Sequence, residues 1–242
     1  MKVIIVALAF CISLSSNAQI FVQSGMIEFE VRTNNHKIFG DGMWAEMIKE
    51  RFPQFSTAYY HFIFKDDKAV YRFDRNDDKM KMPFMQGNPE DNIWFTNFAN
   101  QTYTHQKFVF DDTYLLSDSL KHIDWKLVPN ETREIAGFNC RKAQAVLFDS
   151  VYVFAFYTDE IMVSGGPMSL GGLPGMIMGV TIPRMHTSWI ATKLQLAGFD
   201  ENKIIAPKKG KKKPAGELAE TLKKVTADWG SWGQQSIWNI FL

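Results

Sequence analysis

Apolar and polar residues alternate along several segments of this chain, and this period of two constrains the fold more than any other feature. The first such segment is residues 27–31, where Ile27, Phe29 and Val31 are separated by two glutamates. The same alternation of apolar and polar residues occurs at residues 60–64, 69–73, 102–110, 143–148, 151–158 and 189–196. Successive side chains of a strand point to opposite faces, so each segment predicts a β-strand.

Short polar turns join several of these predicted strands. Residues 65–68 read Lys-Asp-Asp-Lys and residues 75–78 read Arg-Asn-Asp-Asp. Turns of this length connect antiparallel strands as hairpins. The predicted fold is therefore mainly β with a minor α component: a single curved antiparallel sheet, arranged as a half-barrel or barrel-like meander, with a sandwich as the alternative.

Two segments have helical rather than strand periodicity. Residues 42–52 carry apolar side chains at helical spacing and end at Pro53, which predicts one short helix in the N-terminal half. Residues 215–229 have an apolar stripe, acidic residues early and lysines late, as the helix dipole favours. This C-terminal helix is expected to pack on the sheet by its apolar stripe.

The first 18 residues resemble an export signal. A cation at Lys2 precedes an apolar run, and small residues Ser16 and Ala18 end the segment. This pattern predicts a secretory signal peptide with cleavage before Gln19, because the apolar run is too short to span a bilayer. We expect the mature protein in the periplasm or at the outer-membrane periphery, with no transmembrane segment. Phe10 before Cys11 argues against a lipoprotein.

The rest of the chain divides into three predicted parts. Residues 19–206 form the antiparallel β domain, and residues 207–214 form a linker with five lysines. Residues 215–242 are the C-terminal helix and an apolar tail that dock on the same domain. The linker is expected to be a solvated connection, with contact to anionic lipid or acidic partners as the alternative.

Charge and cysteine content exclude two classes of protein. The 27 basic and 26 acidic residues give a net charge of +1, and loss of the signal removes one lysine, so the mature chain has no basic excess for nucleic acid. Loss of the signal also leaves Cys140 as the single cysteine, which excludes an internal disulfide. Cys140 is then either a buried small hydrophobe, which its neighbour Phe138 favours, or a reactive thiol.

A loop rich in glycine and proline lies between apolar segments at residues 165–178. Five glycines and two prolines in 14 residues exclude regular structure throughout, because glycine frees φ whereas proline fixes it. The segment is expected to follow a specific path with its backbone pressed against other groups. Phosphate binding is disfavoured, because no Lys-Ser/Thr pair follows and no βαβ unit surrounds the loop.

Residues 172–177 carry the most specific resemblance to a known family. They are Gly172, Leu173, Pro174, Gly175, Met176 and Ile177, and they match the hexapeptide of the GLPGLI family with methionine at its fifth position. Further matches follow the family order at residues 131–143, which include Gly137 and Cys140, and at residues 155–161 and 164–167. The chain thus resembles this family of exported proteins, found chiefly in Bacteroidetes. The resemblance implies a cell-envelope location but no activity.

The same region supplies the candidate binding residues. Tyr157 and Trp189 are expected to cover the glycine-rich loop of residues 165–178, called the family loop below. Leu173, Pro174 and Met176 either have a structural role or line an apolar cleft or docking edge. Many aromatic side chains, Trp94 among them, are expected on one side of the curved sheet. That concave side either packs as core against the helices or holds a lipid, a peptide or the end of a partner.

Metal binding is the chemical alternative to this role. Met80, Met82 and Met85 lie within six residues, and His186 follows further methionines near the family loop. Thioethers with an imidazole suit Cu(I), although methionine also fills irregular cores. Copper is the only cofactor that the sequence suggests.

Catalysis is the less favoured class. A hydrolase would need a nucleophile such as Cys140 beside a histidine, yet the histidines are scattered and no Gly-x-Ser-x-Gly motif occurs. Two Asp-Ser-apolar triplets, at Ser119 and Ser150, resemble O-glycosylation sites of exported Bacteroidetes proteins. The sequence therefore predicts an exported binding or assembly protein whose partner is an outer-membrane or envelope protein, in a transport system for instance, or a small apolar ligand.

Overall fold

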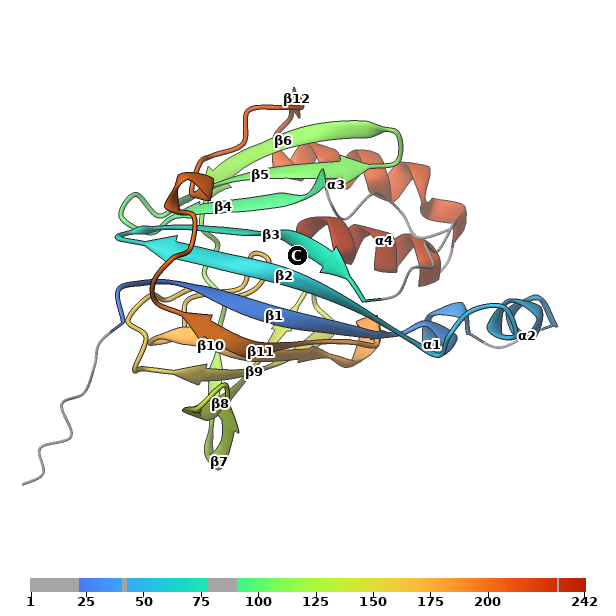
Figure 1. The fold of residues 1–242 in the computed structure, drawn as a ribbon. Helices are drawn as coiled ribbons and strands as arrows, with labels where there is room; N and C mark the ends of the chain where they lie inside the picture. Colours follow the sequence, from blue (N-terminus) through green and yellow to red (C-terminus); the bar gives the residue numbers. More distant parts are fainter. Residues whose placement is uncertain (1–21, 41–42, 78–90, 230) are drawn as a thin grey trace, which may run out of the picture.

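The computed structural model describes residues 22–40, 43–77, 91–229 and 231–242, and these ranges contain one sheet (Figure 1). Its strands, in sheet order, are β12 (Lys211–Lys212), β6 (Asp112–Ser119), β5 (Thr102–Val109), β4 (Ile93–Asn97), β3 (Lys68–Asn76), β2 (Phe55–Lys65), β1 (Ser24–Asn34), β11 (Thr187–Gln195), β10 (Met176–Ile182), β9 (Val151–Thr158), β8 (Phe138–Leu147) and β7 (Lys126–Ile135). All neighbours pair antiparallel except β12 and β6, which are parallel.

Strand β1 is the centre of the sheet and connects its two halves. On one side the chain runs through β2, β3, β4, β5 and β6 as successive neighbours, and on the other side β11 pairs with β1. The second half is a meander from β7 to β11. In β1 the side chains alternate as the period of two predicts, with Ile27, Phe29 and Val31 buried.

Two helices near the C-terminus pack beside one half of the sheet. The described helices are α1 (Asn35–Phe39), α2 (Met43–Lys49), α3 (Ala215–Val225) and α4 (Ser231–Phe241), with short 3-10 turns at Pro183–Met185, Glu201–Lys203 and Ala227–Trp229. Leu218 and Leu222 of α3 pack with Val109, Leu116 and Ile240 in a small apolar cluster. Figure 1 shows α3 and α4 together beside the half of the sheet that contains β5 and β6.

Leu242, the residue after α4, packs in the main apolar core. The indole Nε1 of Trp94 donates a hydrogen bond of 2.9 Å to the carbonyl oxygen of Leu242, and both side chains are buried. Trp94 and Leu242 belong to the large apolar cluster that also contains β1, β9, β10 and β11 residues. The core therefore fills the space between the two halves of the curved sheet.

The structure confirms the predicted fold class: the described chain is mainly β, with one curved sheet and few helices. The predicted helix over residues 42–52 corresponds to α2, and the C-terminal helix to α3. The sequence did not predict α1, α4 or the strands β6, β7, β10 and β12, whereas the aromatic residues that it placed on the sheet include Trp94 of β4. Two residues of the expected linker form β12, which pairs with Tyr114 and Leu115 of β6.

None of the helices in the described residues has the length and apolar content that crossing a membrane requires. The predicted signal peptide, residues 1–18, lies outside the described residues and stays a prediction.

Candidate functional site

The family loop follows the tight path that its glycines predicted. The chain leaves β9 at Thr158, passes through this loop and enters β10 at Met176. The amide of Ile177 donates to the carbonyl of Gly165 at 2.9 Å, and the hydroxyl of Ser164 donates to the carbonyl of Leu173 at 2.6 Å. These bonds join the two ends of the loop, so its backbone is fixed by its own contacts.

Two glycines of the family motifs occupy positions that favour glycine. Gly175 has φ +127°, and a Cβ atom there would lie 2.0 Å from the carbonyl oxygen of Thr158. Gly137 has φ +84° and, with Ala136 at φ +51°, turns the chain between β7 and β8. Ile135 directly before that turn is buried, and so is Cys140 in β8. Backbone conformation explains both glycine positions, and close packing against Thr158 also explains Gly175.

The predicted binding residues lie almost entirely inside the core. Leu173, Met176, Tyr157, Trp189 and Trp94 are buried, as is Ile177, whereas Pro174 is exposed. Gly172, at the other end of the motif, lines an open cleft. A ligand-binding role for the six predicted residues stays a prediction. The cleft itself is bounded by other residues of the same loop.

This cleft has a volume of about 460 Å³ and lies between the family loop, strand β5 and the end of α4. Buried side chains and backbone form its floor, and partly or fully exposed residues form its opening. The floor contains Phe62, His105, Leu116, Gly165, Gly166, Met168, Leu170, Ile240 and Leu242, and the opening contains Thr96, Gln101, Tyr103, Lys121, His122, Phe148 and Gly172. Pockets of this size and mainly apolar lining are typical of small-molecule sites.

His105 is the polar side chain on the floor of this cleft. It is 5% exposed, and among the described residues its Nε2 atom has no hydrogen-bond partner. Its ring lies against that of Tyr103, with centroids 4.3 Å apart. Burial, with a smaller contribution from Lys107, lowers the pKa of His105 well below 6.5, so the imidazole is neutral at pH 7.

Lys107 is a second buried basic group on the same face of β5. Its side chain is 1% exposed, and its Nζ atom lies 3.8 Å from the centre of the Trp94 ring. Burial lowers the pKa of Lys107 well below 10.5. Sequence reasoning singled out neither residue as a site. His105 and Lys107 share one face of the predicted strand with Tyr103 and Val109, and two basic residues on that face gave no signal of burial.

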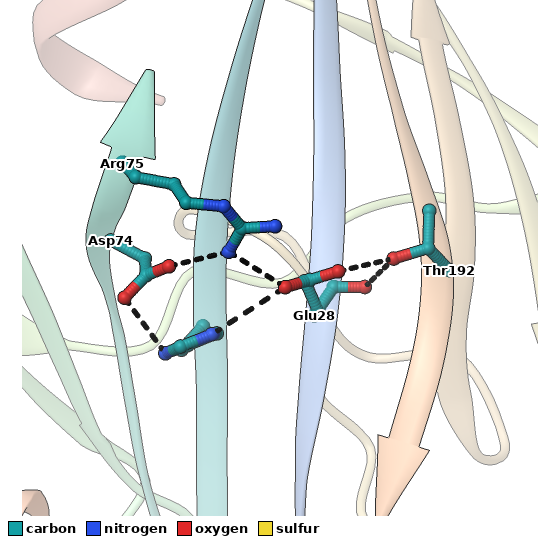
Figure 2. A network of polar contacts seen from close by, with 5 residues as sticks. Glu28, Asp74, Arg75 and Thr192 are labelled. Atoms are coloured by element: carbon teal, nitrogen blue, oxygen red, sulfur yellow. Dashed lines mark hydrogen bonds and ion pairs between the residues drawn. The ribbon is translucent and has the colours of Figure 1, made fainter. Parts of the chain in front are cut away.

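A polar network lies on the opposite face of the sheet, across β1, β2, β3 and β11 (Figure 2). The Arg75 guanidinium lies 2.9 Å from a Glu28 oxygen and 2.6 Å from an Asp74 oxygen. His61 lies 3.9 Å from Glu28 and 3.6 Å from Asp74, and Thr192 donates to Glu28 at 3.0 Å. Glu28, His61 and Asp74 have the ligand types of a metal site. However, Arg75 already supplies the positive charge between the carboxylates.

We predict that Glu28→Gln lowers the free energy of unfolding by about 1 kcal/mol at pH 7. Burial raises the pKa of Glu28, but hydrogen bonds from Arg75 and Thr192 outweigh it, and the net pKa is lowered from 4.5. This stabilisation is therefore present above pH 4.5 and is lost as the pH falls through the lowered value. Urea denaturation from pH 7 to pH 3, with Glu30→Gln as control, measures it. A constant difference between wild type and Glu28→Gln across that range would contradict the prediction.

The copper prediction involves residues that the structure describes only in part. Met80, Met82 and Met85 lie outside the described residues. His186 ends the 3-10 turn Pro183–Met185 with φ +51°, and its side chain is exposed. Copper binding stays a prediction.

Cys140 has the environment of a structural thiol. It is 0% exposed, and its Sγ atom lies 3.5 Å from the carbonyl oxygen of Phe138. Burial, with a contribution from Glu160, raises the pKa of Cys140 to about 12. We therefore expect iodoacetamide to leave the folded protein unmodified at pH 8 and to label Cys140 fully in urea. If mass spectrometry instead detects rapid labelling of the folded protein, Cys140 is a reactive thiol rather than a structural one.

The two serines of the predicted glycosylation triplets lie on exposed surface. Ser119 ends β6, and its amide donates to the Asp118 carboxylate at 2.7 Å. Ser150 lies in the turn between β8 and β9, where Arg184 donates to its hydroxyl at 2.8 Å. Modification of either serine stays a prediction.

Comparison with known proteins found similar solved structures and a matching family. Two crystal forms described as PNGF-II share its fold, with TM-scores of 0.52, sequence identities of 17% and 18%, and coverage of 87% of this chain. The chain spans about a third of each, 34% and 33%. No curated protein matches the sequence. Residues 62–206 match the family described as N-glycanase peptide, N-terminal domain. Since this match covers more than half of the chain, the protein belongs to that family.

Proposed function

We propose that this protein is an exported binding or assembly protein of the cell envelope that holds a small ligand, or the apolar end of a partner, in its cleft. The observation that carries the proposal is a cleft of about 460 Å³ between the family loop, strand β5 and the end of α4, with a mainly apolar lining. Concave sites of this size and lining are typical of small-molecule binding.

The comparisons support a glycan-related context rather than a reaction. The matched family is described by the term N-glycanase, and this chain corresponds to about a third of the structures described as PNGF-II. We infer that the domain is a binding module. It binds either a protein that acts on glycans or another component of the cell envelope. The predicted signal peptide and the GLPGLI-like motif support export to the periplasm or the outer-membrane periphery.

Photo-crosslinking in the native envelope tests this proposal. A photoreactive residue at His122, at the opening of the cleft, is expected to attach a ligand or partner that mass spectrometry then identifies. The same residue at exposed Glu134 on β7, away from the cleft lining, is the matched control. Adducts confined to position 122 support a cleft function. Adducts at both positions or at neither one would contradict it.

A further inference from the structure

The accessible wall of the cleft is apolar, and this restricts the ligand, an inference that rests on the proposed binding function. Six apolar side chains of the lining are at least partly exposed, so their surface is open to a ligand. They are Phe98, Leu120, Ile123, Leu147, Phe148 and Phe241. Transfer of such surface out of water favours a ligand with a hydrocarbon body.

The polar groups deeper in the cleft offer little to a ligand. The carbonyl oxygen of Leu242 accepts hydrogen bonds from the Trp94 indole at 2.9 Å and from the Ser169 hydroxyl at 2.8 Å. The Ser164 hydroxyl donates to a carbonyl oxygen of the family loop at 2.6 Å. His105 Nε2 is enclosed by protein and is not accessible from the cleft. A polar end of the ligand is therefore expected to stay at the opening.

The side chains of the cleft lining that can carry a charge near pH 7 are all basic. They are His105, Lys121 and His122, and no aspartate or glutamate side chain lines the cleft among the described residues. Lys121 and His122 are exposed at the opening. His122 Nε2 lies 3.2 Å from the Asp124 carboxylate, whereas Lys121 has no acidic partner in the described part of the chain. The amine of Lys121 is thus available to an anion that keeps part of its hydration.

We propose that the cleft binds a single-chain amphiphile whose hydrocarbon chain lies against the apolar wall and whose anionic head stays at the opening, beside Lys121. A carboxylate head and a phosphate head both meet this requirement, because a lysine ammonium attracts either one as a point charge. A cationic head would be repelled by Lys121, and a neutral head would gain no ion pair. The charge of the lining therefore complements the head, and its apolar surface complements the chain.

Matched decyl compounds test this proposal. Decanoate, decyl phosphate, decanol and decyltrimethylammonium have alkyl chains of similar length and differ in the charge of the head. Isothermal titration calorimetry at low salt, below the concentrations that form micelles, measures their binding. We expect wild-type protein to bind both anions about 1.5–5-fold more tightly than decanol, the range of one exposed ion pair. Decyltrimethylammonium should bind more weakly than decanol. At about 1 M NaCl the preference for the anions should fall to about 1-fold, because salt screens exposed charges.

Two variants locate the head and the chain. Lys121→Glu is expected to invert the preference, so that decanol binds more tightly than either anion, because the opening then carries a like charge. Lys37→Glu makes the same change of net charge in helix α1, outside the cleft lining, and should keep the wild-type preference. Phe148→Asn removes an apolar ring from the opening at φ +49°, a conformation that asparagine tolerates. It should bind all four probes about 2–10-fold more weakly and keep their order.

The outcomes separate this inference from the function on which it rests. Equal binding of decanol and the anions, tighter binding of the cation, or a preference that Lys121→Glu leaves unchanged overturns the anionic head. Unchanged binding by Phe148→Asn overturns the placement of the chain in the cleft. If no decyl probe binds but adducts still form only at position 122, the amphiphile is wrong and the binding cleft remains. If no probe binds and no adduct forms at position 122, the binding function itself fails.

Discussion

Gly175→Ala is expected to lower the free energy of unfolding by about 3–5 kcal/mol, the largest single effect that we predict. The new Cβ atom would lie 2.0 Å from the carbonyl oxygen of Thr158, a distance that forces the backbone to move. The φ of +127° adds strain for any L-residue other than glycine. Urea denaturation followed by circular dichroism measures the change.

Gly216→Ala is the matched control for this prediction. Gly216 lies in helix α3, and nothing lies within 4 Å of the position that its Cβ would take. Alanine favours the helix over glycine, so stability should stay unchanged or rise by up to about 1 kcal/mol. If both variants unfold at the same urea concentration, the close approach of Gly175 to β9 does not exist in solution.

Lys107→Met is expected to raise the free energy of unfolding by about 1–3 kcal/mol at pH 7. The side chain of Lys107 is buried, and its Nζ atom has no hydrogen-bond partner among the described residues. Methionine keeps the length of the chain and removes the group that loses its hydration. Exposed Lys209→Met should change stability by less than about 0.5 kcal/mol.

The effect of Lys107 on stability should depend on pH with a defined sign. Burial lowers its pKa in the folded state below the unfolded value of 10.5, so between the two values the unfolded chain binds more protons. The contribution of Lys107 to stability therefore becomes more favourable as the pH rises toward 10.5, by at most about 1.4 kcal/mol per pH unit. The advantage of Lys107→Met over wild type should shrink over this range. An advantage that is independent of pH would argue against a buried, neutralised amine.

Periodicity predicted the strands that have one buried and one exposed face, and it missed those that do not. All residues of β10 except Thr181 are buried, on both faces of the sheet, and Ile135 at the end of β7 packs over Gly179. A strand buried on both faces has no alternation to detect. Periodicity did not predict strand β7 for the opposite reason, because most of its residues are exposed at the edge of the sheet. The strand also contains Pro129 beside an irregularity in register.

The candidate site was less predictable than the fold. The family loop and its neighbouring aromatics were identified from sequence, but most of the chosen side chains pack into the core. The cleft joins β2, β5, the family loop and the end of α4, which are far apart in the chain. Whether a buried side chain such as Leu173 or an adjacent backbone segment faces the cleft depends on these long-range contacts.

By itself, the sequence determined that the chain forms a curved, mainly antiparallel sheet with a glycine-rich loop, since alternation and turn residues act locally. Only the tertiary structure decided what the loop faces and which polar groups are buried. His105 and Lys107 gained their properties when the family loop and the C-terminal helices covered one face of β5. Removal of water, a property of the assembled core, is what keeps the imidazole of His105 neutral.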